Sequence, residues 1–141
     1  METTAGAVDT SSRKLHIGLW VAQGLLALAF LGSGFMKVMT PFAELIQNPM
    51  MGWATQVGPN VVKLAGTSEI FGALGLILPG LTRKSPKLTT WAALGLLTIM
   101  VLAAGLHLSR GESPLPNVIL GGLAAFVAWG RSMKVPLLGR R

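Results

Sequence analysis

Long apolar segments alternate with short polar ones along the whole chain. Apolar residues dominate positions 15–39, 61–78, 88–108 and 115–130, and polar residues or prolines border each segment. A transmembrane helix needs about 20 predominantly apolar residues. The pattern therefore predicts an all-α membrane protein whose four membrane-spanning helices form an antiparallel bundle. The fourth segment is short for a span, so the prediction that it crosses the membrane rests on the positions of the basic residues.

The polar segments fit this topology. We expect residues 1–14, which are small and polar as far as Arg13 and Lys14, to be a disordered cytoplasmic N-terminus. Residues 40–60 contain three prolines and mixed polarity, which favours a short helix at the membrane surface between the first two spans. Residues 131–141 form a basic tail. One transmembrane domain, residues 15–130, lies between the two ends.

The basic residues fix the expected orientation. The chain has 12 Lys and Arg against 5 Asp and Glu, a net charge of +7. Most basic residues lie at the two ends or between the second and third spans: Arg13, Lys14, Arg83, Lys84, Lys87, Arg131, Lys134, Arg140 and Arg141. Cytoplasmic segments carry such an excess. Both termini are thus expected in the cytoplasm, which requires the fourth segment to cross. Trp20, Trp91 and Trp129 lie at the basic ends of spans, where interfacial aromatic residues are expected.

Composition excludes several classes of chemistry. The chain has no cysteine, which removes disulfides, thiolate metal sites and cysteine nucleophiles. His16 and His107 are far apart in the sequence and form no spaced metal motif. No basic run with interleaved aromatic residues indicates nucleic-acid binding. The sequence therefore predicts no metal site and no stand-alone enzyme, and it assigns no catalytic residue.

Glu69 is an ionisable residue within the apolar span 61–78, and the need to cross a membrane does not explain its presence there. Its neighbours at helical spacing are mostly small, including Gly66, Gly72 and Ala73. Small residues mark the faces at which membrane helices pack closely, and Gly34 and Gly121 mark such faces on the first and fourth spans. Glu69 is therefore expected to point into the bundle. Ionisable residues inside membranes are functional by default, although a structural ion pair is the alternative.

Three polar residues reach a similar depth on the other spans. They are Lys37, His107 and Asn117, and with Glu69 they could converge in one outward-facing ligand pocket. Each also has a simpler interpretation. Lys37 could extend to the membrane surface, His107 could stabilise a helix C-terminus, and Asn117 could cap a helix N-terminus. We expect Glu69 to be ionised and paired with Lys37, because each charge lowers the desolvation cost of the other.

The motifs "GSGFMK", "KLAGTSEIFGALGLILPG" and "AAGLHL" carry Lys37, Glu69 and His107. With them, residues 15–129 resemble the DoxX-like family of small four-helix membrane proteins. The resemblance implies a bacterial or archaeal cytoplasmic membrane and a link to respiratory or sulfur redox. Founding members look like small subunits of a thiosulfate-oxidising, quinone-reducing enzyme. This chain lacks cysteine, haem-ligand pairs and nucleotide motifs, so redox chemistry would need a partner protein or a bound quinone.

The sequence leaves three functions open. The first is an accessory or quinone-binding subunit of an oxidoreductase, in which Lys37 and His107 donate hydrogen bonds to a quinone oxygen and Glu69 relays a proton. The second is a non-enzymatic binding protein or small carrier for an amphiphile. The third is an assembly factor that binds the helices of a partner. The lipid bilayer is the expected environment, and the oligomeric state, with a homo-oligomer among the alternatives, stays open.

Overall fold

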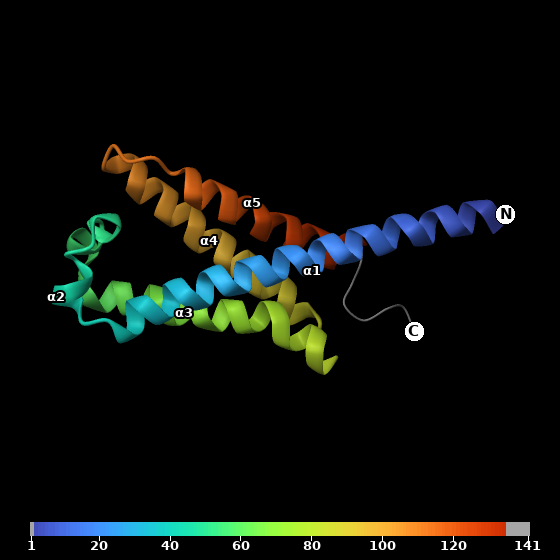
Figure 1. Cartoon of the computed structure of the whole chain (residues 1–141), viewed down its shortest axis with the longest axis horizontal. Helices are drawn as coiled ribbons and strands as arrows, with labels where there is room; N and C mark the ends of the chain where they lie inside the picture. The colour runs from blue at the N-terminus through green and yellow to red at the C-terminus, as the bar shows by residue number, and fades with distance from the viewer. Residues whose placement is uncertain (1, 135–141) are drawn as a thin grey trace.

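The fold comes from a computed structural model, which describes the backbone of residues 2–134 and the side chains of residues 11–133. The elements are helical throughout this part of the chain, as the sequence predicts. In order they are α1 (Glu2–Met39), α2 (Phe42–Leu45), the 3₁₀-helix η1 (Pro49–Met51), α3 (Ala54–Thr82), α4 (Lys87–Ser109), α5 (Leu115–Trp129) and the π-helix η2 (Gly130–Lys134) (Figure 1).

The four long helices pack in a ring. Helix α1 contacts α3 and α5, and α4 contacts the same two helices from the other side. The connection through α2 and η1 lies at the same end of the molecule as the connection between α4 and α5 (Figure 1). We call this end the α2 end. The N-terminus and the connection between α3 and α4 lie at the opposite end.

Within the described part of the chain, three helices are long and apolar enough to cross a membrane. They cover Ser11–Met39, Ala54–Thr82 and Lys87–Ser109, and they contain the first three predicted spans. Large apolar side chains cover their outer surfaces; Leu28, Phe71 and Leu102 are each about two-thirds or more exposed. Such a surface suits lipid rather than water. Helix α5 has 15 residues, fewer than the roughly 20 that a span needs, so its length alone does not make it a fourth span.

Two helix boundaries differ from the prediction. Helix α1 already begins at Glu2, so the segment expected to be disordered is helical, and no proline interrupts it before Met39. Helix α3 begins at Ala54 rather than at residue 61, with a kink at Gly58 (φ 85°, ψ 168°) just before Pro59. Glycine adopts this positive φ without strain, and proline has no N–H to continue the helix. Residues 40–60 therefore hold the short helix α2, the 3₁₀-helix η1 and the first seven residues of α3. Residues 135–141 of the expected tail lie outside the described residues.

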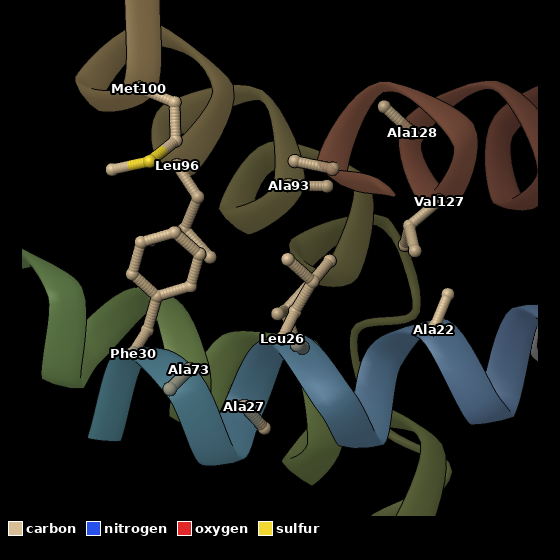
Figure 2. Close-up of a cluster of buried hydrophobic side chains, with 12 residues drawn as sticks. Ala22, Leu26, Ala27, Phe30, Ala73, Ala93, Leu96, Met100, Val127 and Ala128 are labelled. Carbon is tan, nitrogen blue, oxygen red and sulfur yellow. The ribbon is translucent and has the colours of Figure 1, made fainter. Parts of the chain in front are cut away.

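The side chains of residues 11–133 form two buried hydrophobic clusters. The main one joins all four long helices, and in it Phe30 of α1 points toward Leu96 and Met100 of α4 (Figure 2). The second lies at the α2 end and is centred on Leu45, Met51, Ala54 and Val62. Residues 42–57 thus pack on one another and on Val62 of α3, and we call residues 42–57 the covering segment.

Candidate functional site

The crossing of α1 and α3 is made by two glycines. A Cβ atom on Gly34 would lie 2.6 Å from the carbonyl oxygen of Gly66, and one on Gly66 would lie 2.9 Å from that of Gly34. Neither position has room for a larger residue without movement of the backbone. Lys37 and Glu69 each follow one of these glycines by three residues, which on a helix places them on the same face. The close crossing therefore brings these two side chains together.

Lys37 and Glu69 form a buried ion pair. The Lys37 Nζ atom donates to Glu69 Oε1 at 2.6 Å and to Ser33 Oγ at 3.0 Å. The side chains are 10% and 1% exposed. Nζ also lies 5.5 Å from the ring centroid of Trp53, which comes from the covering segment. The predicted pairing is confirmed, and the alternative that Lys37 extends to the membrane surface is wrong, because the carboxylate attracts it inward.

The second oxygen of the Glu69 carboxylate is left without a partner. Oε2 is buried and makes no hydrogen bond within the described part of the chain. Buried polar atoms are nearly always hydrogen-bonded, because removing them from water without compensation is unfavourable. The ammonium group of Lys37 already directs its donors at Ser33 and Glu69 and faces the Trp53 ring. Two of its three N–H groups thus make hydrogen bonds, while Glu69 Oε2 is an acceptor of the pair that makes none within the described residues.

A small hollow lies beside the pair at the α2 end. Its volume is about 10 Å³, which is room for about one water molecule. Side chains from α1, α2 and α3 line it, together with Thr40: Lys37, Phe42, Leu45, Pro59, Val62 and Lys63. Lys37 thus connects the hollow with Glu69. In this arrangement the hollow is far smaller than the head group of a quinone.

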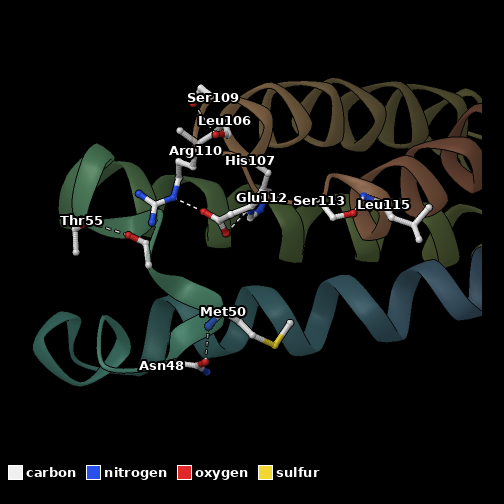
Figure 3. Close-up of polar contacts among 11 residues, drawn as sticks. Asn48, Met50, Thr55, Leu106, His107, Ser109, Arg110, Glu112, Ser113 and Leu115 are labelled. Atoms are coloured by element: carbon white, nitrogen blue, oxygen red, sulfur yellow. Dashed lines mark hydrogen bonds and ion pairs between the residues drawn. The ribbon is translucent and has the colours of Figure 1, made fainter.

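His107 lies in a different polar cluster, in the connection between α4 and α5. Its Nδ1 atom is 3.3 Å from Glu112 Oε2, and Arg110 Nε donates to the other carboxylate oxygen (Figure 3). The hydrogen bond from Arg110 lowers the pKa of Glu112 below the usual carboxyl value, and the contact with His107 acts in the same direction. No contact found among the described side chains joins His107 to Lys37 or Glu69.

Asn117 does not cap a helix. Helix α5 begins at Leu115 after Pro114, so Asn117 is its third residue. The side chain that serves the helix start is Ser113, whose Oγ accepts from the backbone N–H of Leu115 at 3.3 Å. Proline suits the first turn because its missing N–H has no partner there, and Pro116 therefore allows the earlier start. The predicted N-cap is wrong. Asn117 is half-buried, and among the described side chains it makes no hydrogen bond or ion pair with Lys37 or Glu69.

The remaining predicted packing residues lie at helix contacts. A Cβ atom on Gly72 would lie 2.7 Å from the Leu96 side chain, and one on Gly121 would lie 3.3 Å from Met100 Cβ. Ala73 is 1% exposed in the main cluster. The small residues of α3 and α5 thus let α4 approach closely.

The structure also contains a buried polar cluster that we did not predict, at the end opposite α2. Arg131 is 3% exposed, donates from Nε to Gln23 Oε1 at 2.7 Å, and places Nη1 2.9 Å from His16 Nδ1. Gln23 in turn donates to the carbonyl of Leu76. The sequence contained one indication of this cluster, because Gln23 is a polar residue within an apolar run.

Comparison with known proteins gives one match. The model of the DoxX-like family matches residues 21–130, which is most of the chain. The chain belongs to the DoxX-like family. No curated protein and no solved structure gives a significant match.

The matched region of this DoxX-like protein includes the Lys37–Glu69 pair and His107. Among the residues with described side chains, no three His, Asp or Glu side chains come together as metal ligands. The arrangement at the pair has two chemical capacities. It can accept a hydrogen bond at Glu69 Oε2, and it can hold a proton on either partner in a region of low polarity.

Proposed function

We propose that this DoxX-like protein is an accessory subunit of a membrane redox system that binds the head group of an amphiphile, such as a quinone, at Lys37 and Glu69. The observation that carries the proposal is the buried Oε2 atom of Glu69, which lacks a hydrogen-bond partner among the described residues. Buried carboxylate oxygens are nearly always hydrogen-bonded, so Oε2 is available to accept from a hydroxyl-bearing ligand or from water. Both charged side chains also lie within helices able to cross a membrane, where an ionisable residue marks function by default.

The proposal includes a topology with four spans and two cytoplasmic termini, in a bacterial or archaeal cytoplasmic membrane. The 15 residues of α5 and the 5 residues of η2 form one continuous helical segment, which approaches the length that a span needs. The α2 end then faces outward, because the basic residues gather at the opposite end. The hollow beside Lys37 lies at this α2 end.

Native mass spectrometry of the protein, gently extracted from its own membrane, tests the proposal. We expect the wild type to carry a defined small molecule and Glu69→Gln to lose it. Glu44→Gln is the matched control, because it makes the same chemical change on an exposed glutamate. The control should retain the ligand. Wild-type protein that is intact and folded but carries no small molecule would contradict the proposal.

The small size of the hollow favours a second candidate, a membrane assembly factor whose outer helix faces bind a partner's helices. In that case Glu69 serves only to hold α1 and α3 together. Glu69→Gln should then change the yield of a co-purified membrane partner without changing any small-molecule content. A carrier function would instead appear as flux of an amphiphile into liposomes above that of empty vesicles.

A further inference from the structure

We propose that His16 and Arg131 form a pH-sensitive switch, in which protonation of His16 releases η2 from α1. The switch lies in the buried polar cluster at the end opposite α2, away from the Lys37–Glu69 pair. It requires no ligand at that pair, so this proposal and the proposed function can fail separately. In the proposed topology this end of the protein faces the cytoplasm, and the switch responds to the pH on that side.

The polar contact between η2 and α1 needs a neutral histidine. Arg131 Nη1 lies 2.9 Å from His16 Nδ1. A guanidinium group has N–H donors and no acceptor, so Arg131 donates this hydrogen bond and Nδ1 accepts it. An imidazole nitrogen accepts only when it carries no proton, which places the ring proton on Nε2. His16 is therefore neutral while η2 is attached to α1.

Protonation of His16 removes this hydrogen bond and adds a repulsion. A protonated imidazole donates from both nitrogens, so Nδ1 can no longer accept from Arg131. The guanidinium keeps its own charge, and two cations then face each other where Arg131 is 3% exposed, which makes their repulsion stronger than in water. Arg131 relieves it by extending its guanidinium to the aqueous interface. This movement also gives up the bond to Gln23 Oε1, so the attached state is stable until His16 is protonated.

The other charged groups near this end do not change their charge over the relevant pH range. Among the described side chains, Arg131 is the charged group that contacts His16. The remaining basic residues near this end are exposed and stay protonated between about pH 5 and pH 8: Arg13, Lys14, Arg83, Lys84 and Lys87. The described acidic side chains belong to other places, in α2, in the Lys37–Glu69 pair and in the connection between α4 and α5. His16 is therefore the group at this end whose charge responds.

Helix η2 is the element that the switch moves. It begins at Gly130, which packs so closely on α1 that a Cβ atom there would lie 2.5 Å from Leu19 Cδ2. This apolar contact does not depend on pH and holds the start of η2 in place. Beyond it, Arg131 attaches η2 to α1, with its Cζ atom also 5.6 Å from the Trp20 ring centroid. Release therefore begins after Gly130 and leaves the main hydrophobic cluster, which contains no η2 residue, undisturbed.

The separation of η2 from α1 can be measured directly. The chain has no cysteine, so an introduced pair carries the only spin labels. Val21 on α1 and Met133 on η2 suit this purpose because their side chains are 56% and 74% exposed. Dipolar EPR of the labelled full-length Val21→Cys, Met133→Cys protein in lipid nanodiscs should show a shift to longer separations as the pH falls from about 8 to about 5.

Two substitutions in the labelled protein identify the residue that responds. His16→Gln keeps an oxygen that accepts from Arg131 and cannot be protonated, so its label separation should not change with pH. His107→Gln is the matched control, because it removes the other histidine, and it should keep the full shift. His16 is then the sole histidine of the chain, so nitrogen-15 NMR of histidine-labelled His107→Gln reports its protonation. The shift in separation and the titration of His16 should have the same midpoint.

Three results of the EPR measurement would each overturn the proposal. They are a wild-type separation that does not change down to about pH 5, a shift that persists in His16→Gln, and a shift that is lost in His107→Gln. If His16→Gln does not fold, the two midpoints in His107→Gln decide by themselves. Protonation of His16 without a change in separation, or a change with a different midpoint, shows that this contact does not control η2.

Discussion

Removing one partner of the Lys37–Glu69 pair should destabilise the protein far more than removing both. The two side chains are 10% and 1% exposed, and their charged atoms are 2.6 Å apart. Loss of one partner of such a buried pair costs about 3–5 kcal/mol, because the other charge stays buried without compensation. Replacement of both by apolar residues is often neutral or stabilising. The two substitutions should therefore be strongly non-additive.

The two single variants should differ in how much stability they lose. In Lys37→Met, Glu69 can become neutral by binding a proton, so we expect the lower limit, about 3 kcal/mol. That is more than 100-fold in the unfolding equilibrium. In Glu69→Leu, Lys37 keeps Ser33 and the Trp53 ring and can extend toward the surface, so we expect about 2 kcal/mol. The double variant should lie within about 1 kcal/mol of wild type.

Unfolding in mixed micelles with increasing SDS, followed by tryptophan fluorescence, gives the three free energies. Lys84→Met is the control, because this lysine is exposed and its loss should change stability by less than about 0.5 kcal/mol. The reasoning is refuted if each single variant loses less than about 1 kcal/mol and the double variant equals their sum. Such a result would mean that the pair is not desolvated in the folded protein.

Three further predictions follow from other contacts. Gly66→Ala should lower the melting temperature by an amount equivalent to about 1–3 kcal/mol, because the new Cβ atom would lie 2.7 Å from Lys37 Cβ. The control Gly95→Ala has open space around it and should be neutral or stabilising. Equal effects of the two substitutions would refute the close crossing of α1 and α3. Gln23→Leu should lower the free energy of unfolding by about 2 kcal/mol, measured with SDS, because it removes the oxygen that accepts from the buried guanidinium of Arg131. A loss smaller than that caused by a substitution of an exposed residue would contradict this prediction. The pKa of Glu112 is depressed in the folded protein, so its stabilising contribution is complete above the usual carboxyl value and is lost as the pH falls through the depressed one. Glu112→Gln should therefore flatten the fall in melting temperature measured from about pH 6 down to about pH 3, and an unchanged slope would show that other groups cause it.

The sequence by itself determined the three long spans and the depth at which Lys37 and Glu69 lie. Runs of apolar residues define these spans, because a helix in lipid must be apolar over a fixed length. Local spacing also made Lys37 and Glu69 candidates for a pair. Lys37 and Glu69 each lie three residues beyond a glycine that permits close packing, and an isolated charge at that depth needs an opposite one. Spacing along a helix sets depth and face, and both can be read from residue numbers.

Only the tertiary structure decided which residues of equal depth meet. His107 and Asn117 have the depth expected for the pocket, yet His107 pairs with Glu112, and no hydrogen bond or ion pair among the described side chains joins Asn117 to Lys37 or Glu69. Depth follows from a rise of 1.5 Å per residue, whereas lateral distance depends on which helices are neighbours and how each is rotated. The position of Arg131 likewise could not be predicted from spacing along a helix. Its burial against Gln23, a residue 108 positions away, depends on the packing of α5 and η2 on α1, which no local pattern encodes.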